Sequence, residues 1–430
     1  MAQPKIVILG GGFGGAYCAQ ALEGLALPNH AEVLLLDRNN YFAFYPLLME
    51  TGTGNLEPRH AVVPIRSFLK RATFRMGQVQ GIDFVRRQVR YRLTGSDLVG
   101  QTNYDHLVLA LGSITRWLDV PGLRENGYQL KTLGDAVALR DRAIQLLEWA
   151  DAVDDPQERR GLLHFVVVGG NFTGVEVAGE LDAFVKNACR SYRNLRPRDR
   201  SITVVDHADR LLTVLDTDLS DYAMHHMRKR GMDIRLKTTV NEVQPDTVTL
   251  STGEKLMART LIWCAGVEPN PIARQLGLPT GPKGHVLCDR NLCVQGYNNI
   301  WAIGDCASIP DPTGKPYPPT AQHAVRQGRH LAGNLARVLS GREPTPCNIV
   351  SKGALAALGC RSGVAKVYGF KIAGFPAWFL WRSVYLMKMP GLARKVKVAL
   401  DWTMDLIFPK EPVELGIHRR ASSDGKIGPG

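Results

Sequence analysis

The chain is 430 residues long, enough for about two or three domains, and its 45% hydrophobic and 22% charged fractions are those of an ordinary globular protein. The formal net charge of +13 favours phosphate-bearing ligands or an anionic membrane as partners, and the lack of any usual nucleic-acid-binding motif disfavours nucleic acid. The eight cysteines show no C-x-x-C pair or metal-ligand spacing, so we expect no metal site and interpret them as reduced thiols of a cytosolic protein. No apolar run reaches the roughly 18 residues of a membrane-spanning helix. We expect no signal peptide, because a strand begins almost at Met1.

The first predicted element is a strand over residues 6–9, whose continuous apolar run is typical of a parallel strand buried on both faces. A G-x-G-x-x-G turn follows at Gly10, Gly12 and Gly15 and leads into a helix predicted over residues 16–25. Gly10 permits the tight turn, Gly12 lets the backbone approach a pyrophosphate, and Gly15 lets helix and strand pack closely. The helix N-terminus then offers backbone N–H groups to the phosphates.

A second apolar strand, over residues 33–36, ends at Asp37, at the spacing expected for a carboxylate that binds a ribose hydroxyl. The order of strand, glycines, helix, strand and acid predicts a dinucleotide site, and Phe13 and Gly14 inside the turn are counted among its contacts. Residues 73–94 are predicted as strands with basic turns. Residues 104–112 are predicted as a buried strand that ends in a glycine and leads out of the first domain.

The opening element then recurs. A helix is predicted over residues 133–150 and a polar loop over residues 151–160, and Gly169, Asn171 and Gly174 follow another apolar strand. The recurrence indicates an internal duplication of a nucleotide-binding unit. Asn171 stands where the middle glycine is expected. Asn tolerates positive φ, which would preserve the turn, while its extra atoms would crowd a pyrophosphate.

Asp206 closes the predicted strand of residues 202–206 and corresponds to Asp37 of the first unit. A carboxylate at this position favours NADH, because it would repel the 2′-phosphate of NADPH. His207 and Arg210 follow closely in the sequence and weaken that preference.

Further glycines close each unit. Gly112 ends the first crossover strand, Gly266 ends the second, and Gly304-Asp305 follows another apolar strand. With both glycine turns, these features resemble the two-dinucleotide-binding flavoprotein superfamily over about residues 1–345. The resemblance implies FAD in the first unit, NAD(P)H in the inserted second unit, and contact of Gly304 and Asp305 with the ribityl chain of the flavin. No cysteine pair follows the first glycine turn, which counts against thiol–disulfide chemistry.

Residues 318–328, with Ala321 and Gln322, resemble the Ala-Gln motif of type II NADH dehydrogenases, the single-subunit, non-pumping NADH:quinone oxidoreductases. Residues 44–54 and 351–359 are similar to the same family. The resemblance implies that Gln322 lies beside the flavin ring at the quinone pocket. It also implies that Glu176 lies near the flavin–nicotinamide contact and takes part in proton handling.

Both catalytic candidates also have plainer interpretations. Glu176 is expected in the first turn of a helix, where the helix dipole stabilises any carboxylate. Gln322 follows Thr320, a predicted N-cap, and so falls in a first helical turn where it can meet a flavin carbonyl or a quinone oxygen. Cys264 and Cys306 are interpreted as core thiols.

Residues 375–408 mix aromatic residues with spaced cations and contain three of the seven tryptophans. This pattern is typical of a helix that lies on an anionic membrane. A dimerisation helix is the alternative, and the two roles are compatible. The tail after Pro409 is predicted to be disordered.

The predicted fold class is α/β, with two Rossmann-like dinucleotide-binding domains, the second inserted in the first, and a C-terminal membrane-associating region. The predicted boundaries are 1–120 and 284–345 for the FAD-binding domain, 121–283 for the NAD(H)-binding domain and 346–430 for the C-terminal region.

The predicted function is FAD-dependent electron transfer from NADH to a membrane quinone without proton pumping. We expect a homodimer bound peripherally (as a monotopic protein) to the cytoplasmic face of a membrane. One alternative is a sulfide:quinone oxidoreductase on the same scaffold, with Cys347 and Cys360 as candidate thiols. Another is a redox-gated binding partner of the apoptosis-inducing-factor-like type, which would suit the charge of +13.

Overall fold

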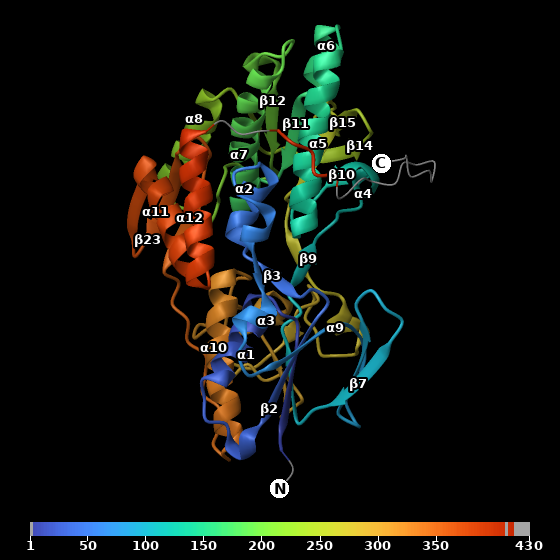
Figure 1. Cartoon of the computed structure of the whole chain (residues 1–430), viewed down its shortest axis with the longest axis vertical. Helices are drawn as coiled ribbons and strands as arrows, with labels where there is room; N and C mark the ends of the chain where they lie inside the picture. The colour runs from blue at the N-terminus through green and yellow to red at the C-terminus, as the bar shows by residue number, and fades with distance from the viewer. Residues whose placement is uncertain (1–2, 409–411, 417–430) are drawn as a thin grey trace. The chain divides into compact units, whose positions relative to one another are not determined.

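The computed structural model describes residues 3–408 and 412–416, and its contacts divide the chain into two compact units. Unit 1 contains Met1–Ala43, Val62–Ile114 and Val267–Ser351. Unit 2 contains Phe44–Ala61, Thr115–Gly266 and Lys352–Gly430. Each unit therefore combines segments that are far apart in the sequence (Figure 1). By contact, the short segment after Ala43 and the C-terminal region both belong to unit 2, a grouping that the sequence-based boundaries did not contain.

Unit 1 is built on a seven-stranded sheet in the order β20-β8-β1-β2-β5-β6-β7. Strands β20, β8, β1, β2 and β5 are parallel, and β5, β6 and β7 form an antiparallel meander. Because β2 and β8 lie on opposite sides of β1, the strand order reverses at β1, and ligands of such sheets bind beyond the carboxyl end of that strand. The strands are β1 (Lys5–Leu9), β2 (Glu32–Asp37), β5 (Thr73–Asp83), β6 (Gln88–Leu93), β7 (Val99–Asn103), β8 (His106–Leu109) and β20 (Ile300–Ala302).

Helices α1 (Phe13–Glu23) and α10 (Ala321–Leu339) pack side by side in unit 1 (Figure 1). Their close approach depends on a glycine, because a Cβ at Gly328 would lie only 2.3 Å from the carbonyl oxygen of Gly14. Helix α1 begins before its predicted start at Ala16, while the predicted strands of this unit are confirmed. The shorter elements of unit 1 are β3 (Tyr41–Ala43), β4 (Val62–Pro64), α3 (Ile65–Phe68), α9 (Ile272–Gln275), β19 (Val286–Leu287) and β21 (Ala307–Ser308).

Unit 2 contains a five-stranded parallel sheet in the order β10-β17-β11-β12-β13. The strand order reverses at β11 as it does at β1, which confirms two Rossmann-like sheets and the duplication predicted from the glycine turns. The strands are β10 (Gly127–Tyr128), β11 (His164–Val168), β12 (Ser201–Val205), β13 (Asp233–Arg235) and β17 (Thr260–Trp263), and a smaller sheet holds β14 (Val240–Val243), β15 (Thr247–Leu250) and β16 (Lys255–Met257). The helices are α2 (Leu48–Gly52), α4 (Leu123–Asn126), α5 (Leu133–Ala152), α6 (Pro156–Leu162), α7 (Phe172–Ala188) and α8 (Thr217–Lys229).

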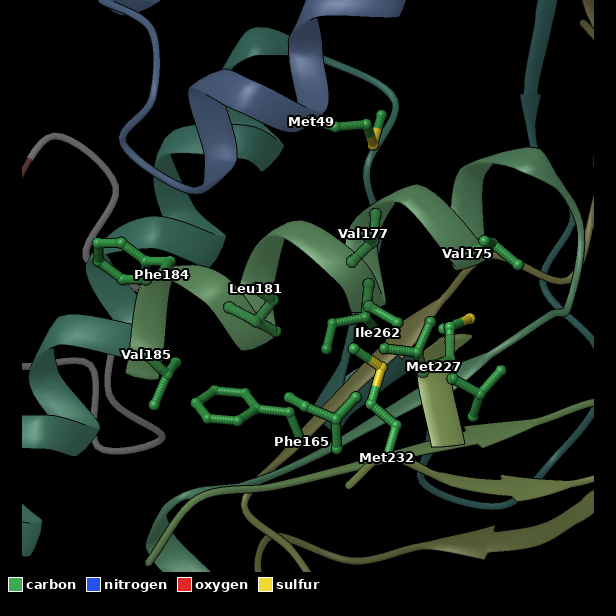
Figure 2. Close-up of a cluster of buried hydrophobic side chains, with 14 of the residues drawn as sticks. Met49, Phe165, Val175, Val177, Leu181, Phe184, Val185, Met227, Met232 and Ile262 are labelled. Carbon is green, nitrogen blue, oxygen red and sulfur yellow. The ribbon is translucent and has the colours of Figure 1, made fainter. Parts of the chain in front are cut away.

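Helix α7 is covered on more than one side. Figure 2 shows Leu181 of α7 facing Phe165 and Ile262 of the sheet, while Met49 of α2 lies across the helix from them. Strand β22 (Gly353–Ala357) also packs against α7. Every residue of α7 from Gly174 to Val185 is consequently buried, polar side chains included.

The C-terminal region of unit 2 is an antiparallel sheet followed by two helices. Strands β22 (Gly353–Ala357), β23 (Gly363–Val367) and β24 (Phe370–Gly374) lead into α11 (Phe375–Lys388) and α12 (Leu392–Ile407), which lie side by side (Figure 1). The turn after β22 approaches α7 so closely that a Cβ at Gly179 would lie 2.4 Å from the carbonyl oxygen of Leu358. Arg230, the C-cap residue of α8, donates to the carbonyl oxygens of both Leu358 and Gly179 and fixes this contact.

The prediction of a loop over residues 151–160 is wrong, because α6 begins at Pro156. Asp155 caps the helix by accepting from the N–H groups of Gln157 and Glu158, and proline suits the first helical position. The polar composition reflects an exposed helix. The predicted disorder after Pro409 lies largely outside the described residues.

Within that tail, residues 412–416 are described and are held by a buried carboxylate of α5. Asp141 is 6% exposed and accepts from the N–H of Leu415 at 2.9 Å and of Gly416 at 3.0 Å. We expect Asp141→Asn, which keeps one acceptor oxygen, to raise cleavage of the tail in limited proteolysis by about tenfold with little change in Tm. Asp151→Asn on the same helix is the control, because Asp151 accepts from Asn194 and should leave tail cleavage unchanged.

Candidate functional site

The first glycine turn, residues 10–15, joins β1 to α1 and leaves open space at its middle glycine. A Cβ at Gly12 would meet no heavy atom within 4 Å, whereas a Cβ at Gly15 would lie 1.9 Å from the carbonyl oxygen of Gly10. Gly12 is the N-cap of α1, and no side chain caps this helix. The turn therefore combines room for a ligand with an uncapped helix N-terminus, which is the arrangement that binds a pyrophosphate.

Asp37, at the end of β2, holds the same turn from the side. Its carboxylate accepts from the N–H of Gly11 at 2.6 Å and of Asn39 at 2.7 Å. Burial raises the pKa of Asp37, and these two hydrogen bonds and the charge of Arg38 oppose the rise. The carboxylate is fixed beside the open space, and its remaining lone pairs can accept from ribose hydroxyls.

The other first-unit candidates follow neighbouring strands of the same sheet. Since β1, β8 and β20 are adjacent and parallel, the residues after them lie at one edge of the sheet. Gly112 and Gly304 have φ of 67° and 72°. Gly304 donates its N–H to Gln327 of α10 at 2.8 Å, and Asp305 accepts from the Ser113 hydroxyl at 2.7 Å. Unit 1 therefore brings Gly112, Gly304 and Asp305 to the edge that carries the first glycine turn.

Gln322 lies in the first turn of α10, as predicted. Thr320 is the N-cap, and its side chain accepts from the N–H of His323. Ala321 is the first helical residue, and the Gln322 amide donates to the Ser351 hydroxyl at 3.4 Å. This hydrogen bond is long, so the amide can exchange it for a stronger acceptor.

The second glycine turn, residues 169–174, repeats the close packing of the first, and Asn171 stands at its middle position. A Cβ at Gly174 would lie 1.8 Å from the carbonyl oxygen of Gly169. The expectation that Asn171 uses positive φ is wrong, because its φ is −80° and it serves as the N-cap of α7. Its side chain accepts from the Gly174 N–H at 3.1 Å and donates to the Cys264 carbonyl at 2.6 Å. One helix N–H is consequently occupied by the protein itself.

Asp206 holds the second turn as Asp37 holds the first. Its carboxylate accepts from the N–H groups of Gly170 and Ala208. The Nδ1 of His207, whose side chain is largely exposed, lies 3.3 Å from Oδ1 of Asp206. Arg210 donates to the carbonyl oxygens of Leu215 at 2.9 Å and Thr213 at 3.0 Å. Its guanidinium is thus bound within its own loop. Gly266, with a φ of 116°, follows β17 beside this turn.

Glu176 lies in the second turn of α7, so the expectation that it sits in the first turn and merely meets the helix dipole is wrong. It is 9% exposed, and its Oε1 accepts from the Ala357 N–H at 3.1 Å and the Trp381 indole at 3.0 Å. Burial raises the pKa of Glu176 to about 8. The two hydrogen bonds lower this pKa, and the charges of Glu180 and Glu50 raise it further. The side chain is therefore mostly protonated at neutral pH and can give up a proton.

Sequence reasoning missed the residues that surround Glu176. Glu50 of α2 is 3% exposed, and its carboxylate accepts hydrogen bonds from Arg382 and Trp402 of the C-terminal helices. A carboxylate inside the apolar run around Leu48 was a signal for a buried charge, but its partners lie more than 300 residues later in the chain. No local pattern connects them.

These residues fit a bound dinucleotide at the first turn, because the space at Gly12 is the volume that a Cβ would fill and a pyrophosphate would occupy. The second turn also fits a bound dinucleotide, although the Asn171 side chain already occupies the Gly174 N–H. Cys264 and Cys306 are buried and burial raises the pKa of both thiols, as expected of core residues.

Residues 4–328 match the family model described as pyridine nucleotide-disulphide oxidoreductase, and residues 351–411 match the NDH2 C-terminal domain. A probable NADH dehydrogenase of Dictyostelium discoideum is 30% identical over 95% of this chain and 90% of its own length. The type II NADH:quinone oxidoreductase of Mycobacterium tuberculosis is 28% identical over 94% of this chain and 89% of its own length. The structure of NDH2 from Plasmodium falciparum in complex with NADH, at 20% identity, has a TM-score of 0.89 and covers 96% of this chain and 100% of that one. The chain therefore belongs to the type II NADH:quinone oxidoreductase (NDH2) family of the pyridine nucleotide-disulphide oxidoreductase superfamily.

Proposed function

We propose that this chain oxidises NADH, uses FAD as the intermediate carrier and reduces a membrane quinone without pumping protons. The observation that carries the proposal is the pair of glycine turns of similar build, one in each unit, in a chain of this family. When bound, FAD accepts a hydride from NADH and returns the two electrons to the quinone. The proposed FAD contacts are Gly10, Gly12, Phe13, Gly14, Gly15, Asp37, Gly112, Gly304, Asp305, Ala321 and Gln322, and the proposed NADH contacts are Gly169, Asn171, Gly174, Asp206 and Gly266.

The second unit should prefer NADH to NADPH. Asp206 places a carboxylate at the end of β12, where it would repel a 2′-phosphate. Arg210 is bound to carbonyl oxygens of its own loop, which removes the nearest guanidinium in the sequence as a phosphate ligand. His207 alone is left to soften the preference.

Reduction of a quinone to a quinol takes two electrons and two protons. The hydride from NADH brings two electrons and one proton, so one more proton must come from the protein or from water. Glu176 is a carboxyl group that holds a proton at neutral pH, and Gln322 offers an amide donor at a helix N-terminus. We assign proton handling to Glu176 and contact with the flavin and quinone to Gln322.

The C-terminal helices suit peripheral attachment to an anionic membrane. No helix in the described part of the chain is long and apolar enough to cross a bilayer. Along α12 the exposed apolar residues recur every fourth position, at Leu392, Val396, Leu400 and Met404, with Lys397 exposed beside them. An apolar stripe edged by cations binds the interface of an anionic membrane. We place this attachment on the cytoplasmic face, and the same stripe would also serve a homodimer.

The purified protein tests the electron path. Anaerobic addition of NADH should bleach the oxidised flavin absorbance, and a short-chain quinone should then restore it. Bleaching by sulfide but not by NADH would instead support the sulfide:quinone alternative. Bleaching without recovery on addition of quinone would contradict the assignment of Gln322 and leave both nucleotide sites standing.

The stripe on α12 can be tested separately. We expect Leu400→Glu with Met404→Glu to lower binding to anionic vesicles about 100-fold or more, since each apolar side chain withdrawn from the membrane costs on the order of 1.5–3 kcal/mol. Val350→Glu is the matched control, because Val350 is 81% exposed and belongs to unit 1. Unchanged vesicle binding with a changed sedimentation coefficient would identify the stripe as the dimer interface instead.

A further inference from the structure

Two buried carboxyl groups in unit 2 receive indole N–H groups from the C-terminal helices. Trp381 of α11 donates to Glu176 at 3.0 Å, and Trp402 of α12 donates to Oε2 of Glu50 at 2.6 Å. Glu176 belongs to α7 and Glu50 to α2, and both are at most 9% exposed. The two C-terminal helices are thus docked onto acids rather than onto apolar side chains alone.

Arg382 completes the contact. The Cζ of its guanidinium lies over the rings of both Trp378 and Trp402, 4.5 Å and 4.6 Å from their centroids, and its Nη2 is 3.3 Å from Oε1 of Glu50. The Nε of Arg382 is buried and has no hydrogen-bond partner among the described residues. Loss of the Glu50 charge would therefore leave this guanidinium poorly compensated, which is costly in a buried site.

Arg382 and Trp381 are consecutive residues of α11. The contacts that fix Arg382 against Glu50 therefore also fix the rotation of α11 and the position of the Trp381 indole. We propose that Glu50 is a positioning residue for the proton step: it holds α11 through Arg382 so that Trp381 donates to Glu176. The inference rests on the proposed role of Glu176 in proton handling.

Several titratable or charged groups face Glu176. Glu180 lies one turn further along α7 and accepts from the Asn55 amide at 2.7 Å. Glu50 acts on it from α2 and Tyr385 from α11, and β22 contributes the backbone N–H of Ala357, while the guanidinium of Arg382 bonds Glu50. The Glu50 charge raises the pKa of Glu176, and the hydrogen bond from Trp381 lowers it. A positional and a purely electrostatic role of Glu50 consequently predict shifts of opposite sign.

The test follows the protonation of Glu176 directly. The carbonyl stretch of its protonated carboxyl group is followed by infrared difference spectroscopy of the FAD-loaded protein against pH, and is identified by its loss in Glu176→Gln. Trp381→Phe should move the midpoint upward by about 1 pH unit, the equivalent of one hydrogen bond to the ionised form. Glu50→Gln should also move it upward, because release of α11 withdraws the same indole.

The double variant makes the test decisive. In the Trp381→Phe background the indole is already absent, so Glu50→Gln should then move the midpoint downward through loss of its charge alone. A downward shift in Glu50→Gln by itself, or no shift, would overturn the positioning role. Glu254→Gln removes a half-exposed charge of unit 2 and should leave the midpoint unchanged.

Two further measurements keep the conclusions separate. If Glu50→Gln fails to fold because Arg382 is left unpaired, Glu50→Gln with Arg382→Gln supplies a neutral hydrogen-bonded pair. This pair should retain α11 and, because the Glu50 charge is gone, place the midpoint no higher than that of the unmodified protein. A midpoint in this pair as high as in Trp381→Phe would contradict the inference. Flavin reoxidation by quinone, measured against pH, should share the infrared midpoint. If it does not, the proton role of Glu176 fails while the structural link from Glu50 is still decided by the infrared result.

Discussion

Glu176→Gln is expected to slow reoxidation of the reduced flavin by quinone about 100-fold or more and to leave flavin reduction by NADH within about twofold. Gln has the same shape and can still accept the N–H groups of Ala357 and Trp381, but it has no proton to give. Stopped-flow measurement of the two half-reactions separates these effects. Equal slowing of both would contradict a role confined to the proton.

The rate of quinone reduction should also depend on pH through Glu176. Because the pKa of Glu176 is raised to about 8, the protonated carboxyl group is present below that pH and is lost as pH rises through it. Quinone reduction in the unmodified protein should therefore fall above about pH 8, and the variant should show no such fall. Glu180→Gln, one turn further along α7, should keep the pH-dependent rate with its midpoint at lower pH, since Glu180 contributes to the raised pKa of Glu176.

The free energy of unfolding should also depend on pH through Glu176. The unfolded chain ionises Glu176 above its ordinary pKa of 4.5, whereas the folded chain keeps the proton up to about pH 8. The unfolded state then binds fewer protons, so the free energy of unfolding falls as pH rises through this window and levels off above it. The Tm of Glu176→Gln relative to the unmodified protein should rise over the same range.

The sequence predicted what local patterns determine. Strand, glycine turn, helix and acid follow one another in a single short stretch of each unit, so the two sheets and their turns were predictable from residues such as Gly10, Gly15 and Asp206. Thr320 was predictable as an N-cap for the same reason. Asp155 and Pro156 carried a usable helix-start signal, which the polar composition of the segment obscured.

The surroundings of Glu176 were not predictable in this way. The helix α7 looks like any helix after a glycine turn, and its burial depends on α2 and on β22, which come from distant parts of the chain. Trp381 and Trp402 were interpreted as membrane or dimer residues, although their rings are buried and their N–H groups bind carboxyl groups. A tryptophan-rich helix has an exposed face and a docking face, and spacing alone does not say which face holds each tryptophan.

Gly15→Ala is expected to abolish FAD retention and to destabilise the protein. The new Cβ would lie 1.9 Å from the carbonyl oxygen of Gly10, and that oxygen belongs to the turn between β1 and α1, which cannot shift without parting helix and strand. Overpacking of this kind costs about 1–3 kcal/mol or more. The protein should therefore purify colourless, with a lowered Tm.

Gly12→Ala is the matched variant that separates the fold from the cofactor. Its Cβ meets nothing within 4 Å and its φ of −73° suits alanine, so the Tm of the FAD-free chain should stay unchanged. The methyl group nevertheless occupies the space assigned to the pyrophosphate, so FAD affinity should fall at least about tenfold. Gly174→Ala, with its clash against Gly169, should instead spare the flavin and weaken NADH binding. If Gly12→Ala kept its full flavin content after dialysis, the first glycine turn would not be the FAD site, whereas flavin loss confined to the Gly12 and Gly15 variants would assign FAD to unit 1 and NADH to unit 2.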